Sequence, residues 1–171
     1  MCHQQRQTLA DLSATEVLIV QSLRALSSKE LATLDQLEQE LKLLIGIKSG
    51  QKAFFDLCRL GKFFGRYGRR PWLFGMTGGL RLTESEVGVL NLLSTHKNDQ
   101  PQRAMDIARW FFAQAIIQNE VSELARTLSM RLPRQSLDVP ERAVMLPPQQ
   151  HNPNLTLRLA ASAPRVPLQS I

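Results

Sequence analysis

Residues 28–46 read SKELATLDQLEQELKLLIG, and this stretch decides the fold class. Its leucines recur at alternating spacings of three and four residues, which places them on one face of an α-helix. The stripe consists of Leu34, Leu37, Leu41 and Leu44. It spans under two heptads, whereas coiled coils sustain about three or four. We therefore predict one half of a helical hairpin rather than a free-standing coiled coil.

Three capping boxes mark the starts of helices, each with a Ser or Thr followed three residues later by Glu. In such a box the hydroxyl accepts a hydrogen bond from the third residue's backbone N–H, and the glutamate accepts one from the first residue's N–H. Apolar residues follow each box, so we predict helices over about 14–26, 28–46 and 83–96. The boxes are Ser13 with Glu16, Ser27 with Glu30, and Thr83 with Glu86.

The remaining apolar segments also have helical spacing. Residues 51–66 form an amphipathic segment, which follows two glycines, Gly46 and Gly50, that we expect to end the preceding helix. Residues 101–118 predict a further helix, which continues or breaks briefly near Gln118 before a last helix through Leu132. The prediction is an all-α fold of five or six helices, with the first two forming an N-terminal helical hairpin.

The composition changes at residue 133. Seven of the nine prolines lie at or beyond this position, and none of the nine glycines does. Proline removes a backbone donor and interrupts helices, so this segment cannot belong to the helical bundle. We predict a helical domain over residues 1–132 and a proline-rich, extended or disordered tail over residues 133–171.

Positive charge is concentrated in one part of the chain. The whole protein has a net charge of +6, while residues 46–82 alone carry +7, from eight Lys and Arg and one Asp. The stretch 57–83 contains no acidic residue and holds six of the nine glycines, with the only tyrosine and one of two tryptophans. The candidate binding residues in it are Arg59, Lys62, Arg66, Tyr67, Arg69, Arg70, Trp72 and Arg81.

A basic segment with interspersed aromatic residues suits a nucleic acid, because cations displace condensed counterions and aromatic rings can stack on bases. We therefore predict a small cytoplasmic nucleic-acid-associated protein, such as a transcriptional regulator or an accessory factor. The loop glycines would allow backbone amides to approach a phosphate. The simplest alternative is that the basic segment is an ordinary solvated surface.

Two other functions remain open from the sequence. The first is a protein–protein adaptor or chaperone-like module, which would bind a protein partner or a second copy in a groove. The leucine stripe at 34–44 and the group Phe54, Phe55, Phe63 and Phe64 would line that groove. The second is a peripheral protein of anionic membranes, since the basic face of residues 51–66 lies opposite an apolar one.

Two stretches resemble helix-turn-helix segments. Residues 82–111 resemble the opening of winged-helix regulators, with a capped helix, a polar turn and a helix bearing Ile-Ala. Residues 122–139 resemble the Glu-Leu-Ala, spacer, Leu-x-Met start of a DNA-binding helix-turn-helix. The first has no recognisable reading helix, and Pro140 would truncate the reading helix of the second. Ordinary helix packing accounts for both patterns, and we favour that interpretation.

Catalytic and cofactor chemistry have no motif behind them. The two cysteines, Cys2 and Cys58, form neither a disulfide framework nor a metal-ligand pair. His3, His96 and His151 are widely separated in the sequence. No serine sits in an activating motif. We predict a non-enzyme that uses no cofactor and no metal, and that has no transmembrane segment.

The first testable prediction concerns the tail. A chain ending at Leu132 should stay soluble and keep nearly the melting temperature of the full chain, because residues 133–171 offer little periodic apolar surface to bury. Circular dichroism with thermal unfolding measures this. Insolubility, or melting far below the full-length protein, would show that the tail packs on the helical domain.

Overall fold

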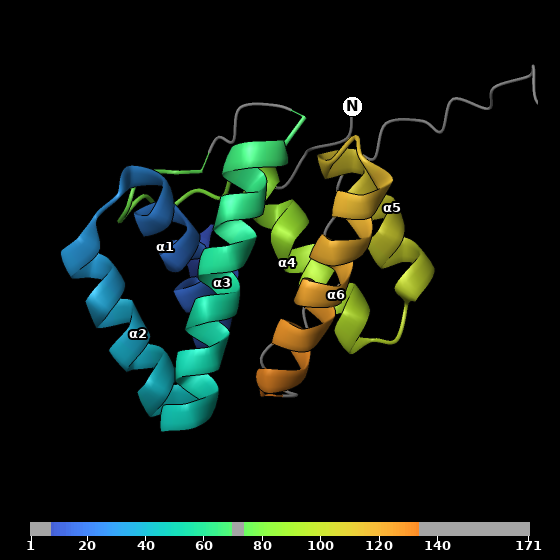
Figure 1. The fold of residues 1–171 in the computed structure, drawn as a ribbon. Helices are drawn as coiled ribbons and strands as arrows, with labels where there is room; N and C mark the ends of the chain where they lie inside the picture. The colour runs from blue at the N-terminus through green and yellow to red at the C-terminus, as the bar shows by residue number, and fades with distance from the viewer. Residues whose placement is uncertain (1–7, 70–73, 134–171) are drawn as a thin grey trace, which may run out of the picture.

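The protein is all-α, as predicted. The computed structural model describes residues 8–69 and 74–133. Within these two stretches the chain forms six α-helices, a short 3-10 turn at Leu9–Asp11 and no strand (Figure 1). The predicted tail, from residue 134 onward, lies outside the described residues. The helices are α1 (Ala14–Ser28), α2 (Leu31–Ile45), α3 (Ile47–Tyr67), α4 (Glu84–Lys97), α5 (Pro101–Phe111) and α6 (Ala115–Arg131).

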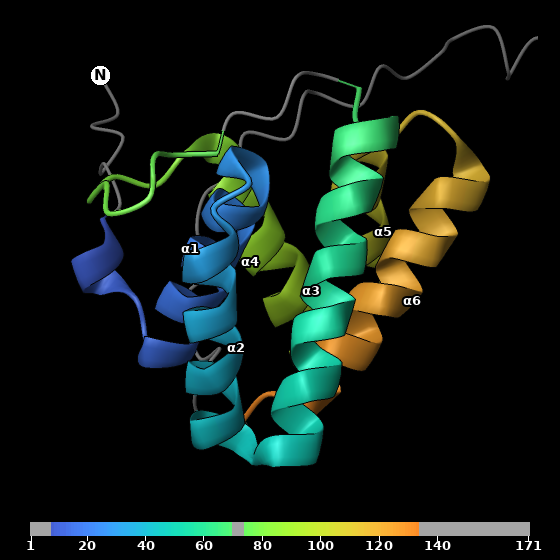
Figure 2. The same cartoon turned by 60° about the vertical axis from the view of Figure 1, so that its left-hand side comes forward.

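The six helices share one core, and α3 occupies a central place in it. Helix α3 stands between α2 and α6 when the molecule is viewed from either of two directions (Figures 1 and 2). It also packs against α1, while α4, α5 and α6 pack against one another. Leu41, Leu57, Phe64, Leu93 and Leu128 all belong to the same buried cluster. The predicted N-terminal hairpin is present, since α2 packs on α1 as well as on α3.

Two of the three predicted capping boxes are confirmed. Glu16 N–H donates to Ser13 Oγ at 3.3 Å, and Glu86 N–H donates to Thr83 Oγ1 at 3.2 Å. The box at Ser27 is wrong, because α1 continues through that residue and ends at Lys29, which adopts a left-handed φ of 60°. A local hydroxyl–glutamate spacing cannot report whether the preceding helix has already ended.

The turn between α2 and α3 is tighter than expected. Gly46 alone makes it, with a φ of 88°, while Gly50 lies inside α3. A Cβ on Gly50 would come within 2.5 Å of the Lys42 backbone. Gly50 therefore permits close packing of two helices rather than ending one, and α3 begins at Ile47 instead of near residue 51.

The helix predicted over 101–118 breaks earlier than expected. Helix α5 ends at Phe111, and α6 starts at Ala115. Phe112 is fully buried, and its ring stacks on Phe64 with centroids 5.0 Å apart. Gln118 holds the turn by donating from Nε2 to the Phe112 carbonyl at 2.9 Å. The break changes the orientation of α6, so Ile116, near the start of α6, is 66% exposed.

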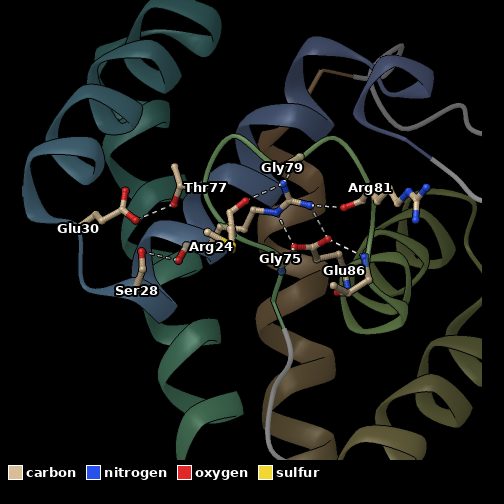
Figure 3. Close-up of polar contacts among 10 residues, drawn as sticks. Arg24, Ser28, Glu30, Gly75, Thr77, Gly79, Arg81 and Glu86 are labelled. Atoms are coloured by element: carbon tan, nitrogen blue, oxygen red, sulfur yellow. Dashed lines mark hydrogen bonds and ion pairs between the residues drawn. The ribbon is translucent and has the colours of Figure 1, made fainter.

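Arg24 of α1 and Glu86 of α4 form an ion pair in which neither side chain is exposed to solvent. Arg24 Nε and Nη2 donate to the two carboxylate oxygens of Glu86 at 2.7 and 2.9 Å. The guanidinium also donates to three backbone carbonyls of the loop before α4 (Figure 3). These carbonyls belong to Met76, Gly79 and Arg81. The loop is thereby wrapped around a buried charge.

The glycines of this loop are explained by that charge. A Cβ on Gly75 would lie 2.8 Å from Arg24 Nη2, and one on Gly79 would lie 3.0 Å from the Met76 carbonyl oxygen. The Gly75 N–H donates to Glu86 Oε1 at 2.9 Å. The expectation that these glycines approach a phosphate is therefore not needed, because the backbone closes on an internal ion pair.

The second prediction tests the ion pair. Arg24→Met should lower the free energy of unfolding by about 3 to 5 kcal/mol, because it leaves a carboxylate and several carbonyls buried without donors. The matched control is Arg109→Met, which removes an exposed pair with Asp106 and should change stability by less than about 1 kcal/mol. Urea unfolding measures both. Equal effects of the two substitutions would contradict the structural role of Arg24.

Candidate functional site

The outward face of α3 carries a row of cations. Their spacing of three or four residues keeps them on one side of the helix, and the 18 residues between the first and last make five full turns, about 27 Å. One aromatic side chain interrupts the row. All six side chains are exposed: Lys48, Lys52, Phe55, Arg59, Lys62 and Arg66. We call these residues the α3 row.

The opposite face of α3 explains why this face is free. Ala53, Leu57 and Leu60 are fully buried, and Phe64 is nearly so. Phe64 packs edge-on against Phe111 with ring centroids 5.3 Å apart. The helix is therefore anchored by its apolar side against the core, which leaves the α3 row in solvent.

The cations of the α3 row have no carboxylate partner. Within residues 8–69 and 74–133, none of the five forms an ion pair. The one acidic residue of α3, Asp56, is nearly buried and pairs with Arg131 of α6. The α3 row therefore presents uncompensated positive charge to any anion that approaches it.

The end of α3 extends the basic surface. Arg69 is exposed, and its backbone N–H donates to the Phe111 carbonyl at 3.0 Å, which fixes this end of the chain against α5. Tyr67 is partly exposed, with its ring 6.0 Å from that of Phe63 and 5.4 Å from the Arg66 guanidinium carbon. Tyr67 is thus already engaged by two neighbours.

The structure separates the remaining predicted site residues from the α3 row. Arg81 lies on the loop around Arg24, where its backbone pairs with Thr8. Its side chain points away from the Arg24–Glu86 pair (Figure 3). Arg70 and Trp72 lie outside the described residues.

Sequence reasoning missed three members of the row. Lys48 was overlooked because Gly50 was expected to end a helix, and Lys52 was placed on the basic face of its helix without being assigned to a site. Phe55 was assigned to an apolar group instead. The alternating spacing from Lys48 to Arg66 was the signal that could have found all of them.

The helix-turn-helix resemblances gain no reading helix from the structure. Helices α4 and α5 reproduce the helix, polar turn and helix of residues 82–111. The next helix, α6, packs on α3, α4 and α5, and its exposed face includes Glu120 and Glu123, which would repel phosphates. Helix α6 continues without interruption to Arg131, so no turn occurs within residues 122–131.

The groove predicted for an adaptor is filled. Leu41, Phe54 and Phe64 lie in the core, so the leucine stripe and most of the phenylalanine group hold the protein's own helices together. The same burial removes the apolar side of residues 51–66 from contact with a membrane. No helix in the described part of the chain has the length and apolarity to cross a bilayer.

A different apolar surface is exposed at the turn between α2 and α3. Leu43 is 86% exposed and Ile47 is 74% exposed, with Leu44 beside them in sequence. We call these three residues the hairpin tip. Sequence reasoning placed Leu44 in the core, but α2 ends there without a neighbouring helix to cover it.

Catalytic groups are not assembled in the described residues. No three His, Cys, Asp or Glu side chains within them are placed to hold a metal ion. Burial raises the pKa of the Cys58 thiol, which makes it a poor nucleophile at neutral pH. No known protein family, curated protein or solved structure matches this chain.

His96 is a structural residue of the α4–α6 contact. Its Nε2 lies 3.1 Å from Ser122 Oγ, and burial followed by repulsion from Arg126 lowers its pKa, with Glu123 acting in the opposite sense. The unfolded chain therefore takes up a proton near pH 6.5 before the folded one does. Stability contributed by neutral His96 is present above that pH and declines below it.

The third prediction follows from this shift. The free energy of unfolding should fall between pH 7 and pH 5.5, by at most about 1.4 kcal/mol per pH unit for this proton. His96→Gln should reduce the slope, while His151→Gln, in the predicted tail, should leave it unchanged. Urea unfolding at a series of pH values measures the slopes, and an unchanged slope in His96→Gln would contradict the assignment.

Proposed function

We propose that the protein is a nucleic-acid-binding accessory factor that contacts phosphates through the α3 row. One observation carries this proposal: five cations lie on a single exposed helix face with no carboxylate partner among the described residues. Arg69, which follows the helix, adds a further exposed cation at one end. Such a face suits a chain of phosphates better than a single small anion.

The physical basis of binding would be counterion release. Each phosphate neutralised by Lys or Arg contributes about −0.9 to the slope of log affinity against log salt on duplex DNA, and about −0.7 on single strands. Five contacts would therefore give a slope of about −4.5 on a duplex. Phosphate contacts carry no base sequence information, so the α3 row by itself supports binding with little sequence preference.

The fourth prediction tests this proposal. Replacing Arg59, Lys62 and Arg66 together by Gln should weaken binding at least about tenfold at 50 mM salt and reduce the slope on duplex DNA by about 2.7 units. Helix content should be unchanged, because all three side chains are exposed. Fluorescence anisotropy with a labelled duplex and single strand, between 50 and 200 mM salt, measures both quantities.

A control triple keeps the change in net charge and moves it elsewhere. Arg103, Arg109 and Arg126 are exposed on α5 and α6, so their replacement by Gln should leave the slope nearly unchanged. If the control weakens binding as much as the α3 triple does, only overall charge matters and the proposed site is wrong. If the wild-type protein binds no nucleic acid at 50 mM salt, the proposed function itself is wrong.

A protein–protein adaptor is the second candidate, and the hairpin tip is the observation that favours it. Leu43, Leu44 and Ile47 expose apolar surface of the kind that a protein partner or a second copy covers. An anionic membrane is the third candidate, since Lys48 follows the tip directly. Absence of nucleic-acid binding favours the adaptor, and binding only to phosphatidylserine vesicles favours the membrane.

A further inference from the structure

Phe55 is an exposed aromatic residue in the middle of the α3 row. It is 57% exposed, although a side chain of this size stabilises a protein most when buried. Within residues 8–69 and 74–133, no other aromatic ring contacts it. Lys52 precedes it by three residues and Arg59 follows it by four, so cations flank the ring along the same face.

We propose that the α3 row takes single-stranded nucleic acid, with an unpaired base stacked on Phe55 and the flanking phosphates held by Lys52 and Arg59. This inference rests on the proposed function and names its substrate class. A phenylalanine has no hydrogen-bonding group with which to read the edge of a paired base. An unpaired base offers a whole ring face, and stacking on an aromatic side chain tolerates any base.

The arrangement on α3 also matches the length of such a ligand. The row runs for about 27 Å along one straight helix, with cations on both sides of the ring. A single strand can lie along a straight row, placing phosphates on cations and turning a base toward the aromatic ring. Tyr67 is less suited to this role, because Arg66 and Phe63 already contact its ring.

The fifth prediction uses the full-length protein and two labelled probes: a 15-nucleotide strand of adenine and cytosine, and the duplex formed with its complement. Phe55→Ala should weaken binding to the single strand about fivefold to about 150-fold and change duplex binding less than twofold. The salt slope should not change, because no phosphate contact is removed. Circular dichroism should match the wild type, since the side chain is largely exposed.

Two further variants separate stacking from apolar contact. Phe55→Trp should restore single-strand affinity and show fluorescence quenching by the single strand beyond that of the wild type. Phe55→Leu should behave like Phe55→Ala. If Phe55→Leu keeps wild-type affinity, or if Phe55→Ala weakens both probes equally or neither, the stacking role is overturned while the proposed function stands.

The remaining outcomes distinguish the two proposals. Tight duplex binding without single-strand binding overturns only the substrate class. No binding of the wild type to either probe overturns both. If Phe55→Ala weakens binding to phosphatidylserine vesicles and leaves nucleic-acid binding intact, Phe55 belongs to a membrane-contacting surface and the inference is wrong.

Discussion

The buried guanidinium of Arg24 must have every donor satisfied, and much of the chain path follows from this requirement. Burying an ion pair is unfavourable unless its hydrogen bonds are complete. Glu86 supplies two acceptors, and the loop between α3 and α4 supplies three backbone carbonyls. One side chain therefore joins α1, the loop and the start of α4. The same loop reaches the start of α2, where Thr77 donates to Glu30 at 2.9 Å.

This constraint divides the glycine-rich basic segment into two parts with different roles. The loop glycines at 75 and 79 make room for Arg24 and the backbone around it. The part before residue 69 belongs to α3 and carries the cations. Because the loop is held on the α1 and α4 side of the molecule, it does not contribute to the α3 row. Composition merges these parts, since it counts Gly and Arg without regard to where the backbone turns.

The helices were predictable because their signals are local. Two capping boxes and the three-and-four spacing of apolar residues depend on neighbours within one turn. The errors occur where a distant contact decides the outcome. Phe112 leaves the helix because its ring packs on Phe64, and Gly50 stays in one because Lys42 crosses it. Arg24 and Glu86 are 62 positions apart, and no local pattern pairs them. Arg24 was conspicuous only as a charge within an apolar segment.

The candidate site was half predictable for the same reason. Arg59, Lys62 and Arg66 stand out by composition, whereas Lys48 joins them only when α3 is known to start at Ile47. Which aromatic residue remains exposed depends on the packing of α3, because Phe54 and Phe55 are adjacent and only the second faces solvent. Sequence alone could not choose between them.

The α3 row is also unfavourable for the helix that carries it. Lys48 and Lys52 are like charges four residues apart, as are Lys62 and Arg66, and each such pair destabilises a helix by about 0.2 to 0.5 kcal/mol. Lys48 lies in the first turn, where the helix dipole favours acidic residues. The stability of α3 must therefore come from its buried face. Local preferences that are broken repeatedly along one exposed face, with no compensating contact among the described residues, are typical of a surface kept for binding. The exposed ring of Phe55 breaks another such preference at the centre of the same face.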